Sequence, residues 1–105
     1  MGRIDYEAFE KEPFEEYDIT FDFAPKLKQG IIISSIETGY PKATRLSDNA
    51  DVTTGCIGTS SFSGAVITVR VKGGSDGNRI KIEFRITDTA GEKHESGVIM
   101  EVNDK

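Results

Sequence analysis

The chain has 105 residues, enough for one domain with its own core, and its formal net charge is −5. Acidic and basic residues are interleaved along most of it, which disfavours nucleic-acid binding, because that function requires clustered lysine and arginine. The single cysteine excludes an intrachain disulfide. We see no signal peptide and no apolar stretch of membrane-spanning length, so a soluble protein made in the cytoplasm is expected.

The negative charge is concentrated at the N-terminus. Residues 1–18 contain seven acidic and two basic residues, which gives 2 − 7 = −5, whereas the remainder contains 11 of each. Residues 1–16 show no alternation typical of a strand, and Pro13 disfavours a helix running through it. We therefore predict an acidic N-terminal arm over residues 1–16 and a β-sandwich domain over residues 17–105.

The first predicted strand is Tyr17–Phe23, where apolar and polar residues alternate. The next, Ile31–Ile36, is apolar on both faces, and we expect it to be the most buried segment. A short strand over Ala43–Leu46 and a weak, bent strand over Val52–Ser63 follow.

The last third of the chain carries the clearest pattern. Three runs, Ala65–Lys72, Asn78–Asp88 and Glu92–Asn103, are joined by glycine-rich turns, and the middle run alternates strictly between apolar and polar residues. This pattern predicts an antiparallel meander. With the earlier runs it gives about seven strands, and we predict an all-β fold, an immunoglobulin-like or fibronectin-like antiparallel β-sandwich.

Individual polar residues offer no persuasive catalytic or cofactor site. His94 is expected to be a solvated strand residue, and Cys56 a small apolar residue of the core. The glycine-rich connection before Asn78 lacks the order of a phosphate-binding loop. The oxygen-rich cluster of Asp48, Asn49 and Asp51 is typical of a turn, and whether it binds an ion stays open.

We predict instead that charged side chains bind a protein partner. The acidic residues of the N-terminal arm complement basic residues that point outward from the predicted strands, so an arm of one subunit is expected to dock on the next. The predicted partner-binding residues are Glu12, Glu15, Glu16, Arg70, Lys72, Arg79, Lys81 and Arg85.

Several segments carry a family resemblance. They are residues 11–23, residues 27–35, residues 69–77, residues 84–91 and residues 99–102. Together they resemble the small fiber-tail adaptor or neck-type proteins of tailed phages and prophages. The resemblance implies an immunoglobulin-like virion protein without catalysis, made in the bacterial cytoplasm, which joins tail or neck components and self-associates in a ring. No cofactor, nucleic acid, membrane or small-molecule substrate is expected.

The alternative is a ligand-binding or adhesion module of a bacterial protein with the same fold. Sugar-binding sandwiches usually expose tryptophan or tyrosine platforms, but this chain has no tryptophan, and its three tyrosines do not share one strand. An adhesion domain would normally be one repeat of a longer secreted chain.

Overall fold

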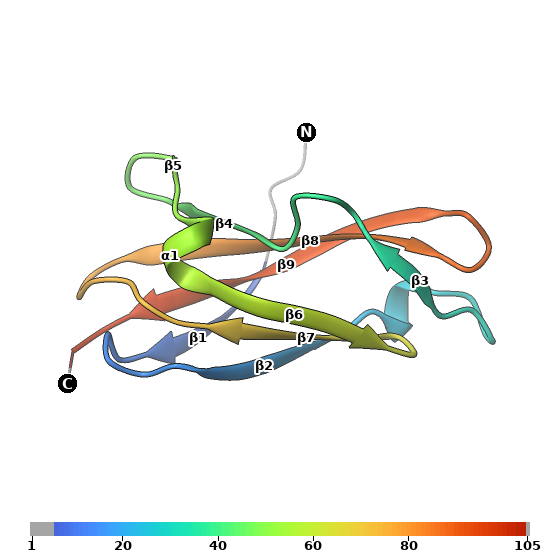
Figure 1. Cartoon of the computed structure of the whole chain (residues 1–105), viewed down its shortest axis with the longest axis horizontal. Helices are drawn as coiled ribbons and strands as arrows, with labels where there is room; N and C mark the ends of the chain where they lie inside the picture. Colours follow the sequence, from blue (N-terminus) through green and yellow to red (C-terminus); the bar gives the residue numbers. More distant parts are fainter. Residues whose placement is uncertain (1–5, 105) are drawn as a thin grey trace.

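The computed structural model describes residues 6–104, which form nine strands and two short helices (Figure 1). The strands are β1 (Glu7–Lys11), β2 (Tyr17–Asp22), β3 (Ile33–Ile36), β4 (Lys42–Arg45), β5 (Ala50–Asp51), β6 (Ile57–Ser63), β7 (Val66–Val71), β8 (Arg79–Asp88) and β9 (Lys93–Val102). The helices are η1 (Ala24–Lys26) and α1 (Thr53–Cys56). Among the described residues, no helix is long and apolar enough to cross a membrane.

The strands form two sheets packed face to face. The larger sheet has the order β1-β9-β8-β4-β5, with β3 also paired to β8, and the smaller has the order β2-β7-β6. In immunoglobulin domains, strands B, E and D form one sheet and strands C, F and G the other. Here β2, β7 and β6 take the first arrangement, and β4, β8 and β9 the second. The predicted immunoglobulin-like sandwich is therefore confirmed, with nine strands rather than about seven.

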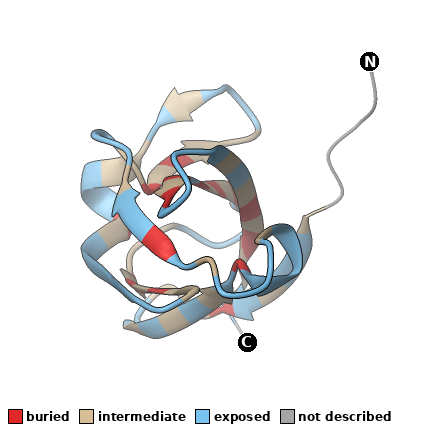
Figure 2. Ribbon diagram, turned by 90° about the vertical axis from the view of Figure 1, so that its right-hand side faces the viewer, coloured by how far each residue is buried: buried red, intermediate tan, exposed pale blue. Residues whose placement is uncertain are grey.

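The core lies between the sheets, where the inward residues of the predicted meander are buried (Figure 2). Phe21 of β2 contacts Phe84 of β8 across this layer, with ring centroids 5.1 Å apart. The buried apolar cluster consists of Phe23, Ile33, Ala43, Cys56, Ile67, Val69, Val71, Ile80, Ile82, Phe84, Ile86, Met100 and Val102. The strict alternation in β8 thus does produce one buried and one solvent-facing side.

The acidic N-terminal segment is not a free arm between Glu7 and Lys11. Those residues form β1, which pairs with the edge of β9 in the parallel direction, whereas all other ladders are antiparallel. Phe9 lies opposite Met100 and packs against the core. The division at residue 16 stays a prediction, although β1 joins the acidic segment to the larger sheet.

The middle of the chain differs from the prediction in two places. The run Ile31–Ile36 is not the most buried segment, because β3 covers only one end of β8 and Ile32 is 47% exposed. The predicted weak strand over Val52–Ser63 divides into α1 and β6, and β5 lies in a region predicted as a loop. β7, β8 and β9 supply most of the buried residues instead.

Candidate functional site: the edge strand β6 and the acidic loop

Strand β6 is an outer strand of the smaller sheet and pairs only with β7. Its sequence, IGTSSFS, contains no charged residue and no proline, and every residue after Ile57 is exposed. A register irregularity between Ile57 and Ser60 leaves a regular stretch from Ser60 to Ser63. Natural edge strands are usually protected by charge, proline or short length. β6 has a bulge but no charge, so its side chains do not block the addition of another strand.

The direction of the backbone groups on β6 follows from its pairing. On β7, the N–H of Lys72, just beyond the strand, donates to the Cys56 carbonyl on the β6 side, whereas the Ala65 carbonyl accepts from Phe23 on the opposite side. Backbone groups alternate along a strand, so even-numbered β7 residues bond toward β6. Thr68 is paired with Ser61, which leaves the N–H and C=O groups of Ser60 and Phe62 directed away from the sheet.

The other outer strands are protected. β1 carries Glu7 and Glu10, and β2 carries Asp18 and Asp22, which place carboxylates along both edges. β5, at the far side of the larger sheet, is only two residues long. Charge and short length are common means by which proteins block the addition of another strand. β3, which pairs only with β8, is uncharged but only four residues long, so β6 is the longest uncharged outer strand of the described chain.

The loop between β1 and β2, here called the acidic loop (residues 12–16), is held by Lys11. This side chain is 1% exposed, and its Nζ donates to the backbone carbonyls of Glu12 at 2.7 Å, Pro13 at 3.3 Å and Glu15 at 2.8 Å. The N–H of Glu15 donates to the Glu12 carbonyl, and the N–H of Glu12 donates to Glu15 Oε1. These bonds fix the loop conformation from within.

Lys11 occupies a position where alternation in β1 places an inward side chain, opposite Val102. Burial lowers the pKa of its ammonium below the ordinary value, while the nearby Cys56, Glu15 and Glu16 oppose this shift. A buried ammonium is tolerated when its donors find acceptors, and the three loop carbonyls supply them. The sequence does not predict this role, because a lysine among glutamates gives no signal of burial.

The predicted basic row lies on the outer face of the larger sheet, where each side chain is paired within the chain. Arg79 lies 3.2 Å from Glu101, Lys81 lies 3.8 Å from Glu83, and Arg85 lies 2.6 Å from Glu95. Two of these pairs join β8 to β9 across the ladder. Lys72 follows β7 in the connection to β8. The role of these residues in binding a partner stays a prediction.

One contact between the acidic segment and a basic strand occurs inside the chain, and docking of the arm on another subunit stays a prediction. Arg70 of β7 contacts Glu16 at 3.2 Å and Asp18 at 3.4 Å, between the side-chain nitrogens and carboxylate oxygens. These contacts raise the pKa of the Arg70 guanidinium above its ordinary value. Arg70 therefore offsets charge on one flank of the acidic loop, whereas Glu12 lies on the other and Glu15 borders both.

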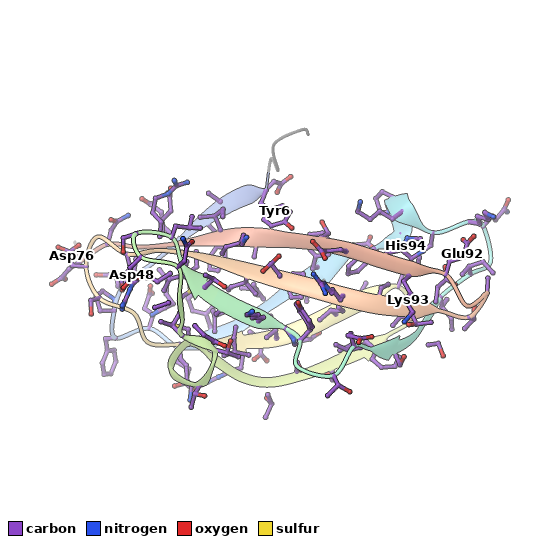
Figure 3. The ribbon with its side chains drawn as sticks, turned by 90° about the horizontal axis from the view of Figure 1, so that it is seen from above. Tyr6, Asp48, Asp76, Glu92, Lys93 and His94 are labelled. Atoms are coloured by element: carbon purple, nitrogen blue, oxygen red, sulfur yellow. The ribbon has the colours of Figure 1, made fainter. Side chains whose placement is uncertain are left out.

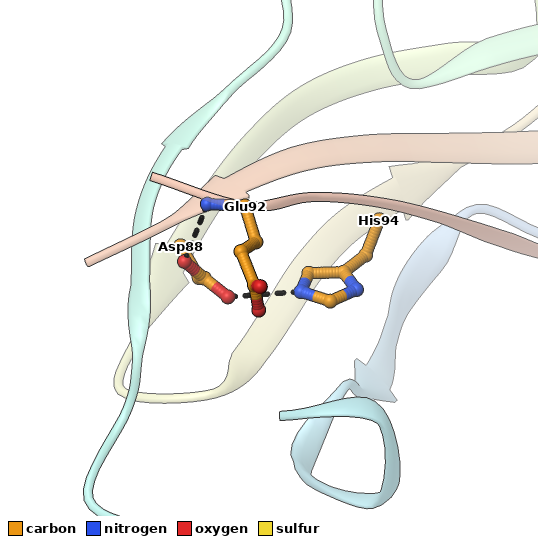
Figure 4. Close-up of side chains that lie close together, drawn as sticks. All are labelled: Asp88, Glu92 and His94. Carbon is orange, nitrogen blue, oxygen red and sulfur yellow. Dashed lines mark hydrogen bonds and ion pairs between the residues drawn. The ribbon is translucent and has the colours of Figure 1, made fainter. Parts of the chain in front are cut away.

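At the far end of the sandwich, Asp88, Glu92 and His94 gather at the β8–β9 turn (Figures 3 and 4). Asp88 is 2% exposed; one oxygen accepts the N–H groups of Ala90 and Glu92, and the other lies 2.9 Å from His94 Nε2. Burial alone would raise the pKa of Asp88, but the hydrogen bonds from His94 and the turn backbone lower it overall. His94 is thus a half-buried turn anchor rather than only a solvated residue.

Potential ligand atoms of these three residues lie within 4.8 Å of one another, and within residues 6–104 no other His, Cys, Asp and Glu cluster meets that criterion. Both oxygens of Asp88 already have hydrogen-bond partners. A cation would have to displace His94 from the buried carboxylate. The arrangement is therefore explained by the structure of the turn.

The Asp48 loop is organised by its own side chains. Asp48 accepts two hydrogen bonds from Arg45, at 3.0 and 2.8 Å, and these lower its pKa to about 2. Asp51 accepts the N–H and hydroxyl of Thr53. This is the predicted turn, and each of the two carboxylates accepts hydrogen bonds from groups of its own loop or the flanking elements. Cys56 is buried as predicted, and burial raises the pKa of its thiol.

Tyr17 and Tyr40 are also engaged within the chain. The Tyr17 hydroxyl donates to the Glu10 carbonyl, and Arg85 lies over the Tyr40 ring, 4.7 Å from its centroid. Neither ring therefore presents a bare platform for a sugar.

A two-layer sandwich with a long uncharged edge strand and an exposed loop held by internal hydrogen bonds is typical of a module for contacts between proteins. The family model described as podophage GP4 fiber-tail adaptor protein gp77 matches residues 11–101. The chain therefore belongs to this family of phage fiber-tail adaptors, which confirms the resemblance. It is a structural adaptor of a phage tail, a role that implies contacts with other tail proteins. No curated protein matches the chain.

Proposed function

We propose that the chain is a non-catalytic virion component that joins two neighbouring tail proteins, one of them along strand β6. Synthesis in the bacterial cytoplasm and incorporation there into the particle are part of this proposal. An adaptor must hold two partners at once, so it needs two separate surfaces. The uncharged β6 edge supports the first of these contacts.

The proposed contact is strand addition. Ser60 and Phe62 each present one N–H and one C=O group to an extended segment of the partner. The Phe62 side chain, 39% exposed, adds apolar area at the same edge. Main-chain bonds then provide affinity, and side chains that alternate along the added strand provide specificity.

Ser60→Pro tests this contact, with Ser60→Ala as its matched control. Proline removes an N–H group that points away from β7, and proline is tolerated at outward positions of edge strands and near bulges. Alanine removes the hydroxyl and keeps the N–H. Each variant is expressed in the phage that encodes the chain, and its amount per particle is measured by quantitative mass spectrometry.

We expect Ser60→Ala to enter particles normally and Ser60→Pro to be depleted, while both retain the circular dichroism spectrum of the parent. Normal incorporation of a folded Ser60→Pro chain would overturn the β6 contact. Absence of the parent chain from purified particles would overturn the adaptor role itself.

A further inference from the structure

Phe14, at the tip of the acidic loop, is 99% exposed. Only two other large apolar side chains of the described residues are substantially exposed, Ile32 at 47% and Phe62 at 39%. Shallow hollows lie on both sides of Phe14, one bordered by Tyr17 and Arg70 and the other by Pro13 and Asp104. The ring therefore projects from the surface and makes little contact with its own chain.

The loop that carries Phe14 is preorganised. Lys11 bonds to the carbonyls on both sides of Phe14, those of Pro13 and Glu15, and the Glu12–Glu15 hydrogen bonds close the turn. An aromatic side chain on a fixed backbone loses little conformational entropy when it binds. Aromatic residues, including phenylalanine, are enriched in the buried cores of protein interfaces.

The charges around Phe14 indicate what kind of pocket its ring fits. Glu12, Glu15 and Glu16 surround Phe14 in the sequence, and the only basic residue in this stretch, Lys11, turns its ammonium inward onto carbonyls. Arg70 offsets Glu16 on one flank only. The projecting ring therefore has a negative rim, which complements an apolar pocket bordered by lysine or arginine.

We propose that Phe14 is an anchor that inserts into an apolar, basic-rimmed pocket of a different tail protein and so forms the second contact of the adaptor. The inference rests on the proposed adaptor role for the statement that the partner is a tail protein. Residues Glu12 and Glu15 steer the loop toward that pocket and set its orientation.

A second copy of this chain fits the anchor less well. Arg79 and Arg85 on the broad outer face each lie against a glutamate of their own chain. The hollow beside Arg85 is lined by Glu37 and Glu95 as well as by Lys93, so its rim has both signs of charge. Docking on a second copy would therefore require these intrachain pairs to separate.

Photo-crosslinking in purified tail particles identifies the occupant. Phe14 is replaced by benzoylphenylalanine, and Phe62 is replaced in the same way in a second chain as a probe of β6. We expect the probe at position 14 to attach to another tail protein at a peptide with apolar residues flanked by lysine or arginine. Attachment to a second copy of this chain, or incorporation without any adduct, would overturn the proposal.

Competition provides a second readout, because the probe is bulkier than phenylalanine. Parent chain and Phe14→Ala are co-expressed during infection, and their ratio in particles is compared with their ratio in the cell. We expect Phe14→Ala to be depleted at least about tenfold, as for a central aromatic anchor, with an unchanged thermal midpoint. Equal incorporation of the two chains would contradict an anchoring role.

The double variant Glu12→Gln/Glu15→Gln tests the charge. The amide oxygen of glutamine still accepts the Glu12 N–H, so the loop is retained while two charges are removed. We expect weaker retention in particles washed at low salt and a smaller loss of retention as salt increases. A salt response identical to that of the parent would exclude steering by these residues. Adducts at position 62 alone would leave the adaptor role intact and remove only the Phe14 anchor.

Discussion

Strands β8 and β6 meet solvent in opposite ways. β8 lies inside the larger sheet, pairs with three other strands and buries every second side chain. The charged side chains on its other face form ion pairs with residues of β9 or of β8 itself. β6 has one neighbour, exposes nearly every residue and carries no charge. The difference separates two tasks: β8 stabilises the domain, and β6 remains available for a partner. Substitutions on the two strands should therefore affect different measurements.

The largest effect is expected from Phe84→Ala on β8. Phe84 is fully buried and contacts Phe21, so truncation removes apolar burial and leaves a cavity, with a loss of about 3–5 kcal/mol in the free energy of unfolding. Phe62→Ala on β6 is the matched control and should cost about 1 kcal/mol or less, because Phe62 is partly exposed. Urea unfolding measures both, and equal losses would contradict the separation of tasks.

The next effect concerns the buried end of β1. Lys11→Met keeps the apolar stem but removes the donor to three loop carbonyls, and we expect a loss of about 2 kcal/mol in the free energy of unfolding. Lys72→Met, at a partly exposed position, serves as the control and should be near neutral. A near-neutral Lys11→Met variant would show that the loop does not depend on the ammonium.

The contrast between β8 and the N-terminal segment also shows which strands can be predicted from the sequence pattern and which cannot. β8 was predicted because its inward residues are all apolar until Asp88. β1 was missed because its inward positions combine Phe9 with Lys11, and a buried lysine defeats any rule based on hydrophobic alternation. The Ile31–Ile36 run shows the opposite error, because its apolar pattern predicts a buried strand. The run lies at one end of the larger sheet, where few residues pack over it.

The candidate sites were also only partly predictable from the sequence. The sequence lists the basic and acidic residues but does not show which of them form pairs. The register between β8 and β9 places Arg79 opposite Glu101, and the β1–β2 loop places Glu16 near Arg70. Asp88 and His94 meet only because the β8–β9 hairpin folds one over the other. The exposed edge at β6 required knowledge of strand order, which local patterns do not contain.

Acid should weaken the domain through the β8–β9 turn. The pKa of Asp88 is lower in the folded chain than its unfolded value of about 3.9, so its contribution to stability is present above that value and is lost as pH falls through the folded pKa. We expect the thermal midpoint of the parent to fall as the pH decreases below about 4. Asp88→Asn should have a lower midpoint at neutral pH and a flatter profile in acid.

Asp48 supplies a comparison at the surface, since its pKa is also lowered, in this case by Arg45 and to about 2. Solvent screens that exposed pair, so Asp48→Asn should change the profile less than Asp88→Asn does. The reverse order would place the acid-sensitive contact in the Asp48 loop instead of the turn.

The smallest effect on stability, and the sharpest test of the comparison, is expected from Ser61→Lys. Ser61 is exposed and its backbone bonds toward β7, so adding a long charged side chain should change the free energy of unfolding by no more than about 0.5 kcal/mol. The substitution nevertheless gives β6 the kind of protection that β1 and β2 already have. If β6 receives a partner strand, a stable Ser61→Lys chain should be depleted in particles, whereas Ser61→Thr should not. Equal incorporation of both variants would show that the lack of charge on β6 has no role in assembly.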